Sequence, residues 1–160
     1  MLGLYDGTDP STAPVCNLPS GEVQVLQPMN AYYCPDVSGD FVAWDVGFMA
    51  KAFEIGDTFV YLIVAHEWGH AIAFQLNADS QSVAGELQAD CFAGAALYGA
   101  VRDGTLILEE GDEREITNGL TDIADETEWT SVQDHGDPFQ RIEAFNRGRT
   151  QGPVACLPSG

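Results

Sequence analysis

The stretch Val64–Phe74, VAHEWGHAIAF, places two of the three histidines of this chain four residues apart on an otherwise apolar segment. Its apolar character and the break at Gly56 before it predict an α-helix from about Thr58 to Leu76. Positions i and i+4 lie on one face of an α-helix, so His66 and His70 can direct two imidazole nitrogens at one metal ion. This helix therefore decides both the fold and the first candidate site.

Glu67 follows His66 and completes the pattern HExxH, which is typical of zinc hydrolases. In such enzymes the histidines bind zinc, and the glutamate acts on the attacking water rather than on the metal. The alternative is a pair of hydrogen-bonded histidines on a buried helix, because short motifs also match by chance. The longer pattern HExxHxxGxxH is excluded, because Ala73 and Leu76 stand at its glycine and third histidine.

A second helix, expected over Val83–Arg102 after a cap at Ser80 or Ser82, offers the missing ligand. Glu86 and Asp90 are again four residues apart, and acids are costly to bury unless they are paired or bound to metal. We expect Glu86 to be the third zinc ligand and Asp90 to accept the N–H of one ligating histidine. Two surface acids on an amphipathic helix are the alternative. Alanines on one face of this helix predict the close approach of a neighbouring helix: Ala89, Ala93, Ala96 and Ala100.

The third histidine, His135, lies in a loop expected over residues 129–136, ahead of a helix that begins at Pro138. A hydrolase of this kind needs a group that stabilises the oxyanion of its tetrahedral intermediate, and His135 and Arg141 are the candidates. Asp134 is the candidate for orienting His135. A loop histidine without a catalytic role is the alternative.

The composition restricts the partners. Twenty-five acidic residues against six basic ones give a formal net charge of −19. Such a surface repels phosphate backbones and anionic membranes, so no nucleic-acid partner is expected. No apolar run near the motif is long enough to span a bilayer, and residues 1–6 do not resemble a signal peptide. A calcium site within Glu109–Glu115 stays open, although the run lacks the alternating ligands of an EF-hand loop.

Four widely spaced cysteines without a CxxC pair argue against a cysteine zinc cluster. Their even number indicates two disulfides and hence an oxidising compartment. Of the three pairings we favour Cys16–Cys34, which closes the N-terminal region, and Cys91–Cys156, which ties the C-terminal tail to a core helix. Four buried free thiols are the alternative.

The remaining pattern predicts one domain, residues 1–160, of the α+β class and mostly helical. A hydrophobic content of 45% is enough for one core of ordinary size. Residues 1–32 are rich in turn-forming residues and are expected to be largely irregular. The other expected elements are strands at Glu22–Leu26 and Asp40–Asp45, helices at Val46–Glu54 and Asp112–Glu126, and a helix from Pro138 to Arg147 or Gly148.

The ordered motifs HEWGH, ELQADCFAG and HGDPFQRIEAFNRG resemble the neutral zinc metallopeptidases of bacteria, over about residues 33–149. A looser similarity extends to gluzincins of the CAAX-prenyl and heat-shock membrane protease type, which share HExxH, a later ExxxD, and a histidine followed by Arg-Ile. The resemblance implies a zincin-like domain with a small edge strand or sheet beside the HExxH helix. The sequence departs from the family pattern at Trp68, where a smaller residue is common, and at Ala71, where a histidine is frequent.

The resemblance implies a zinc metallopeptidase that uses one Zn²⁺ ion, acts on a peptide or protein, and is located outside the cell or in the bacterial cell envelope. We expect the substrate to lie extended beside the strand at Phe41–Trp44. The alternatives are a non-catalytic zinc-binding domain and a zinc hydrolase with a non-peptide substrate. The resemblance implies that His66, His70 and Glu86 bind zinc and that Glu67 is the general base. It also implies that Asp90 supports one of the zinc ligands. His135 and Arg141 would lie near the active site.

Overall fold

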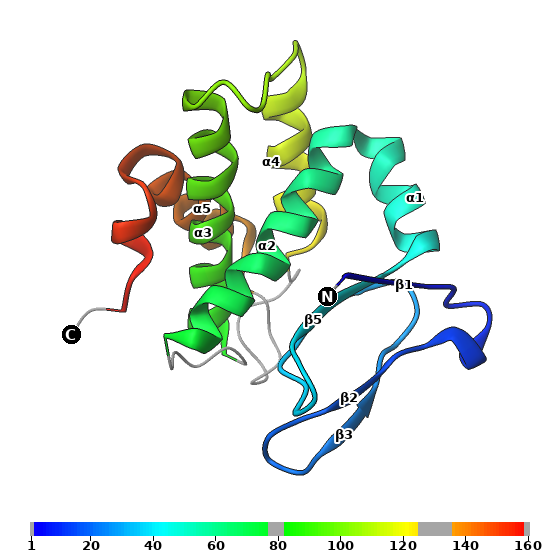
Figure 1. The fold of residues 1–160 in the computed structure, drawn as a ribbon. Coiled ribbons are helices and arrows are strands. Elements are labelled where there is room, and N and C mark those ends of the chain that lie inside the picture. Colours follow the sequence, from blue (N-terminus) through cyan, green and yellow to red (C-terminus); the bar gives the residue numbers. More distant parts are fainter. Residues whose placement is uncertain (1, 77–81, 125–135, 159–160) are drawn as a thin grey trace.

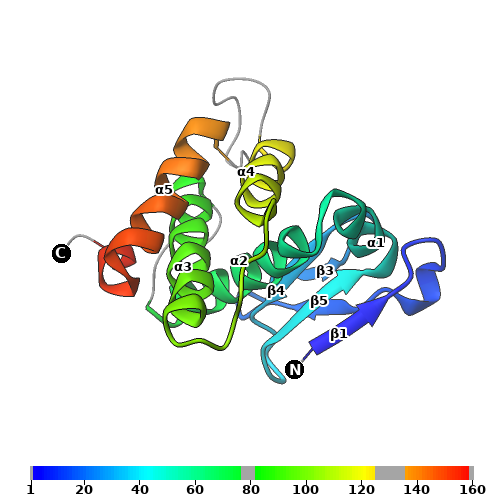
Figure 2. The same ribbon diagram turned by 90° about the horizontal axis from the view of Figure 1, so that it is seen from above.

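Helix α2 (Asp57–Gln75) lies between a small β-sheet on one side and helices α3 and α5 on the other (Figures 1 and 2). The computed structural model describes residues 2–76, 82–124 and 136–158, and its fold is α+β with helices predominating. The other helices are α1 (Val46–Ile55), α3 (Val83–Arg102), α4 (Asp112–Asp122), α5 (Pro138–Gln151) and the 3₁₀ helices η1 (Pro10–Thr12) and η2 (Pro153–Cys156). The strands are β1 (Leu2–Tyr5), β2 (Val15–Asn17), β3 (Val23–Val25), β4 (Ala31–Cys34) and β5 (Phe41–Asp45).

The three-stranded sheet has the order β1-β5-β4, and its edge strand β4 packs against α2. This confirms the expected edge strand beside the HExxH helix. Strand β5 pairs in parallel with β1 and antiparallel with β4. Because β5 is hydrogen-bonded on both sides, the expectation that a substrate adds a strand beside Phe41–Trp44 is wrong. The available edge of this sheet next to α2 belongs to β4.

Sequence periodicity located the helices well, because their apolar faces are buried against one another. The helix predicted over Val83–Arg102 is confirmed to the residue, with Ser82 as its N-cap, whose side chain accepts the N–H of Gly85. The last helix is longer than expected and reaches Gln151. The predicted acidic helix is shorter and ends at Asp122.

The N-terminal segment is more ordered than its composition predicts. Residues 1–32 were expected to be largely irregular, and β1, β2 and the start of β4 were not expected. The predicted short strand at Glu22–Leu26 corresponds to β3. These strands have three or four residues, too few for a clear alternating pattern, and β1 forms by pairing with β5, about 40 residues away in the sequence.

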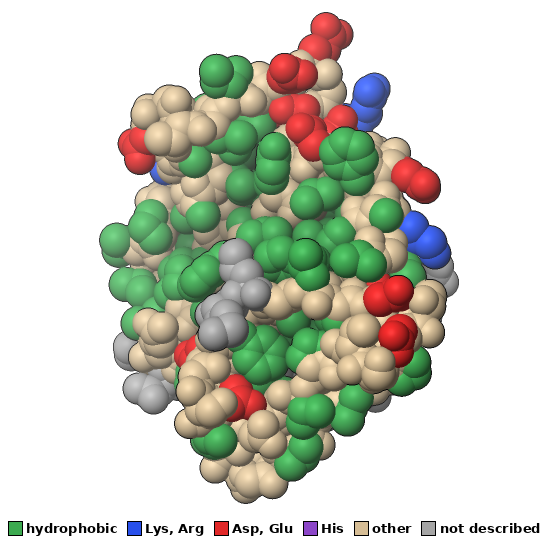
Figure 3. Space-filling view, turned by 45° about the vertical axis from the view of Figure 1, so that its right-hand side comes forward, with side chains coloured by type: hydrophobic (Ala, Val, Ile, Leu, Met, Phe, Trp, Pro, Cys, Tyr) green, Lys and Arg blue, Asp and Glu red, His purple; other side chains and the backbone are tan. Residues whose placement is uncertain are grey.

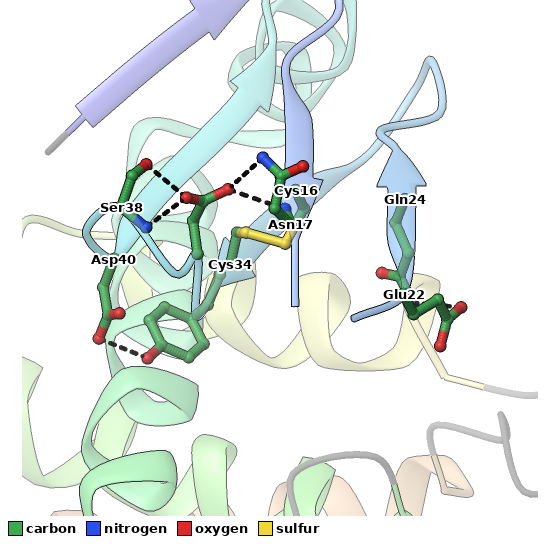
Figure 4. The surroundings of a disulfide bond; sticks show 9 residues. Cys16, Asn17, Glu22, Gln24, Cys34, Ser38 and Asp40 are labelled. Carbon is green, nitrogen blue, oxygen red and sulfur yellow. Dashed lines mark hydrogen bonds between the residues drawn. A yellow bond between two sulfur atoms is a disulfide. The ribbon is translucent and has the colours of Figure 1, made fainter. Parts of the chain in front are cut away.

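Hydrogen bonds to Asp36 hold this region together beside the Cys16–Cys34 disulfide. Figure 4 shows two of its partners, Asn17 and Ser38, near that disulfide. The side chain of Asp36 accepts the backbone N–H and the side-chain amide of Asn17 at 2.7 and 2.9 Å. It also accepts the hydroxyl and the backbone N–H of Ser38 at 2.5 and 2.8 Å. The Ser38 hydroxyl and these N–H groups hold the pKa of Asp36 well below its ordinary value.

Both favoured disulfides are present. Cys16–Cys34 joins β2 to β4 with a Cα–Cα distance of 5.9 Å, and Cys91–Cys156 joins α3 to η2 with a Cα–Cα distance of 5.6 Å. The Gln88 side chain on α3 also donates to the carbonyl oxygen of Cys156 at 2.8 Å. The C-terminal segment is thereby attached to the helix that carries Glu86.

Helices α3 and α5 touch through a glycine on each helix. A Cβ atom added at Gly94 would overlap the carbonyl oxygen of Phe145, and one added at Gly148 would overlap the carbonyl oxygen of Cys91. The predicted alanine face of α3 is right only in part. Ala89 and Ala93 are fully buried, whereas Ala96 is exposed.

A Gly148→Ala variant is expected to lower the free energy of unfolding by about 1–3 kcal/mol, because the added methyl group forces the two helices apart. Gly99→Ala is the matched control on α3, since its new Cβ would meet only Arg102 at an ordinary 3.8 Å. The control should raise the free energy of unfolding by about 0.5–1 kcal/mol through helix propensity. Urea unfolding followed by circular dichroism measures both. Equal effects of the two substitutions would contradict this account of the α3–α5 contact.

One face of the molecule combines apolar and acidic surface. Hydrophobic side chains form a broad band across its middle, and acidic side chains gather near its top (Figure 3). Exposed apolar side chains on α1 and α2 include Phe53, Tyr61, Trp68 and Ile72.

Among the described residues, no helix combines the length and the apolar character needed to cross a bilayer.

Candidate metal centre

The two histidines of HExxH point from α2 towards α3. His66 and His70 are buried, and their Nε2 atoms lie 3.0 Å apart. The pairing follows from the helix itself, because residues four apart are separated by only about 40° around the axis. The rings meet edge to face, with their centroids 4.6 Å apart.

Glu86 of α3 completes a group of three. Its Oε2 lies 3.2 Å from Nε2 of His66, and its Oε1 lies 3.3 Å from Nε2 of His70. Ligands at about 2.0–2.1 Å around a tetrahedral zinc ion lie roughly 3.3 Å from one another, which matches these separations. Two imidazoles and one carboxylate are also a donor set of catalytic zinc sites. The three side chains predicted to bind zinc are therefore brought together in a group that could hold a metal ion.

Behind the metal-facing atoms, Asp90 and Arg141 fix the ring of His66. Nδ1 of His66 lies 2.9 Å from Oδ1 of Asp90, so its N–H donates to the carboxylate and Nε2 keeps its lone pair for a metal. Nε and Nη2 of Arg141 donate to the two Asp90 oxygens at 2.8 Å each. Nη1 of Arg141 donates to the carbonyl oxygen of Ile123, also at 2.8 Å. Asp90 and Arg141 are 0% and 1% exposed, so Arg141 faces Asp90 rather than solvent.

Opposing effects set the charges of this group in the metal-free chain. Burial raises the pKa of Asp90, but Arg141 and His66 outweigh it and bring that pKa below its ordinary value. Burial lowers the pKa of His66, but the carboxylates of Asp90 and Glu86 outweigh it and raise that pKa to about 10. A metal ion that binds here must therefore displace a proton.

The α2–α3 contact that brings Glu86 to the histidines depends on Gly69, inside HEWGH. A Cβ added at Gly69 would lie 2.6 Å from the carbonyl oxygen and 2.8 Å from Cα of Ala89, a residue located between Glu86 and Asp90. No larger residue fits at Gly69 without moving the helices apart. The sequence contains a signal for this close helix contact: a glycine lies between the two histidines, and an alanine lies between the two acids.

Glu67 is buried and lies about 100° around α2 from His66, within about 20° of Phe74, whose ring lies against Tyr33 of β4. Trp68 is half exposed and lies about 200° from His66, on the outer side of the helix. The departure from the family pattern at Trp68 is therefore remote from the three metal-facing side chains. Ala71, the other departure, is buried.

The predicted residues His135 and Asp134 lie outside the described residues. The next residue, Gly136, lies against the first turns of α3. A Cβ added there would be 3.4 Å from both Val83 and Leu87, the latter next to Glu86.

A second acidic group combines Asp112 and Glu115, from the run considered for calcium, with Asp57 of α2. The Glu115 side chain accepts the hydroxyl of Thr58 at 2.7 Å, and the Asp112 side chain accepts the N–H of Glu109 at 2.6 Å. The first bond joins α4 to α2, and the second holds the turn that precedes α4, so both carboxylates have partners without a metal ion.

The family model described as "Putative neutral zinc metallopeptidase" matches residues 73–157, which include Glu86, Asp90 and Arg141 and begin after His70. The chain is 31% identical over 161 residues to "Uncharacterized protein YpfJ" of Escherichia coli K12 and to the protein of that name in Escherichia coli O6:H1. Each alignment covers 82% of this chain and 55% of the relative, so the chain spans about half the length of these curated relatives. No solved structure matches it.

Proposed function

This chain belongs to the "Putative neutral zinc metallopeptidase" family, and from that premise we propose that it is a zinc-dependent peptidase with Glu67 as its general base. The observation that carries the proposal is the meeting of His66, His70 and Glu86, with ligand atoms 3.0–3.3 Å apart. These three side chains would hold one zinc ion. When bound there, zinc would supply Lewis-acid activation of a water molecule.

The protein groups then have separate tasks. Glu67 takes the proton of the attacking water and delivers it to the leaving amine. Asp90 holds His66 in the tautomer that exposes its Nε2 lone pair. Arg141 keeps Asp90 ionised and oriented, so we assign it a positioning role in place of contact with the oxyanion. A closed structural site would have no use for a buried carboxylate at Glu67, which favours catalysis over a purely structural zinc ion.

For the oxyanion we retain His135, oriented by Asp134, as the proposed stabilising group. The support is indirect: Gly136, its neighbour in sequence, lies against the turn of α3 that carries Glu86.

We propose that a peptide substrate adds a strand to the edge of β4, which packs against α2 on the flank that carries Glu67. Backbone hydrogen bonds to such an edge hold a peptide extended, with alternate side chains facing the protein. The two disulfides are compatible with a location outside the cell or in the cell envelope, which is part of the same proposal.

Removal and return of zinc tests the proposal. The chain stripped with a chelator and reloaded with zinc should bind one ion and cleave an unstructured peptide mixture, with cleavage lost again on chelation. Mass spectrometry of the fragments and metal analysis give the two readouts. One bound zinc without peptide cleavage would refute the peptidase. Turnover of ester substrates would then indicate a non-peptide hydrolase, and no turnover a structural zinc site.

A further inference from the structure

Beside the metal centre, an aromatic pair is formed by Phe74 of α2, which is exposed, and Tyr33 of β4, which is half-buried. Phe74 follows His70 by four residues and Glu67 by seven, so the three side chains lie on neighbouring positions of one side of α2. The ring centroids of Phe74 and Tyr33 lie 5.9 Å apart at a tilt of 56°. Phe74 remains 36% exposed despite this contact.

Tyr33 is held by a hydrogen bond and lies on the face of β4 that is turned to α2. Its hydroxyl donates to Asp40 Oδ2 at 2.8 Å. Alternate residues of a strand share a face, and Ala31, two residues before Tyr33, is buried in the core cluster that includes Leu62 and Ile63 of α2. The face of β4 that carries Tyr33 is therefore the face turned to α2. A peptide added to the edge of β4 would pass this ring.

The three metal-facing side chains are largely buried. The side chains of His66, His70 and Glu86 are 8%, 11% and 14% exposed. His70 and Phe74 are one turn apart on α2, so the metal group and the aromatic pair adjoin. In a chain of net charge −19, this pair offers an uncharged apolar surface next to the metal group.

We propose that Tyr33 and Phe74 form a recognition site for a large apolar side chain of the substrate, which sets the cleavage preference. The inference rests on the proposed peptidase function and adds a substrate class: peptides with Phe, Leu or Met close to the cleaved bond. Acidic side chains at that position are rejected, because Asp40 beside Tyr33 and the overall charge repel them.

Binding to an inactive zinc-loaded variant tests the site without turnover. In a Glu67→Gln background, two fluorescent peptides that differ only by Phe or Ala at one position are titrated, with anisotropy as the readout. The Phe peptide should bind about tenfold more tightly, since burying an aromatic side chain removes its apolar surface from water. Adding Phe74→Ala should remove this preference, while Phe74→Leu should retain part of it. Tyr33→Phe, which keeps the ring, should leave the preference intact.

Phe53→Ala is the matched control, because Phe53 is an exposed phenylalanine on α1 outside the pair. It should leave both affinities unchanged. Equal loss for both peptides in Phe74→Ala, or no preference in the Glu67→Gln background, overturns the recognition site. If the protein with Glu67 cleaves no peptide while the preference is present and depends on Phe74, the peptidase function fails and the recognition site stands.

Discussion

Peptide cleavage by a Glu67→Gln variant is expected to fall by at least about 100-fold, with zinc content unchanged. A general base typically contributes a factor of about 10²–10⁴ to the rate, and glutamine has the same shape but cannot take a proton. The three groups that meet at the metal position are His66, His70 and Glu86, and Glu67 is not among them. The measurement is the initial rate on an unstructured peptide, together with metal analysis of both proteins.

The control is Glu54→Gln, the same chemical change at an exposed position of α1, which should keep full activity. Loss of zinc in Glu67→Gln would show that Glu67 supports the metal, and the general-base assignment would then be wrong. Retention of both zinc and activity would show that another group takes the proton.

The group of three was accessible from the sequence because each half of it is local. Spacing i and i+4 fixes His66 against His70 on one helix, and it fixes Glu86 near Asp90 on another. That the two helices meet at this point depends on Gly69 and Ala89, and both residues are present between the paired positions. Local periodicity and one close helix contact are therefore enough to assemble the centre.

What the sequence did not reveal is non-local. Arg141 was placed near the active site, but its bond to Asp90 joins residues 51 positions apart and no short pattern encodes it. The parallel pairing of β1 with β5 also joins segments distant in sequence. It occupies the edge of β5 that Phe41–Trp44 was expected to offer to a substrate. The approach of Gly94 to Phe145 and of Gly148 to Cys91 also joins two helices, each of which is an ordinary helix when considered alone.

An Arg141→Met variant is expected to lose about 3–5 kcal/mol of unfolding free energy and to bind zinc about 10–100-fold more weakly. The first effect arises because Asp90 stays fully buried without its guanidinium partner. The second arises because the carboxylate that orients His66 is no longer held in place, and the loss of such support typically weakens metal binding by this factor. Urea unfolding of the metal-free chain and competition with a zinc chelator measure the two effects separately.

Arg149→Met on the same helix is the matched control. Arg149 pairs with Glu113 at the surface, at 2.6 Å, and exposed pairs contribute roughly 0–1 kcal/mol, so stability should change little and zinc affinity not at all.

A double-mutant cycle identifies the residue through which Arg141 affects zinc affinity. If Arg141 acts through Asp90, Arg141→Met should reduce zinc affinity much less when Asp90→Asn is already present. Additive losses of affinity would mean that Arg141 reaches the metal group by another path, through its 3.4 Å approach to Nδ1 of His66.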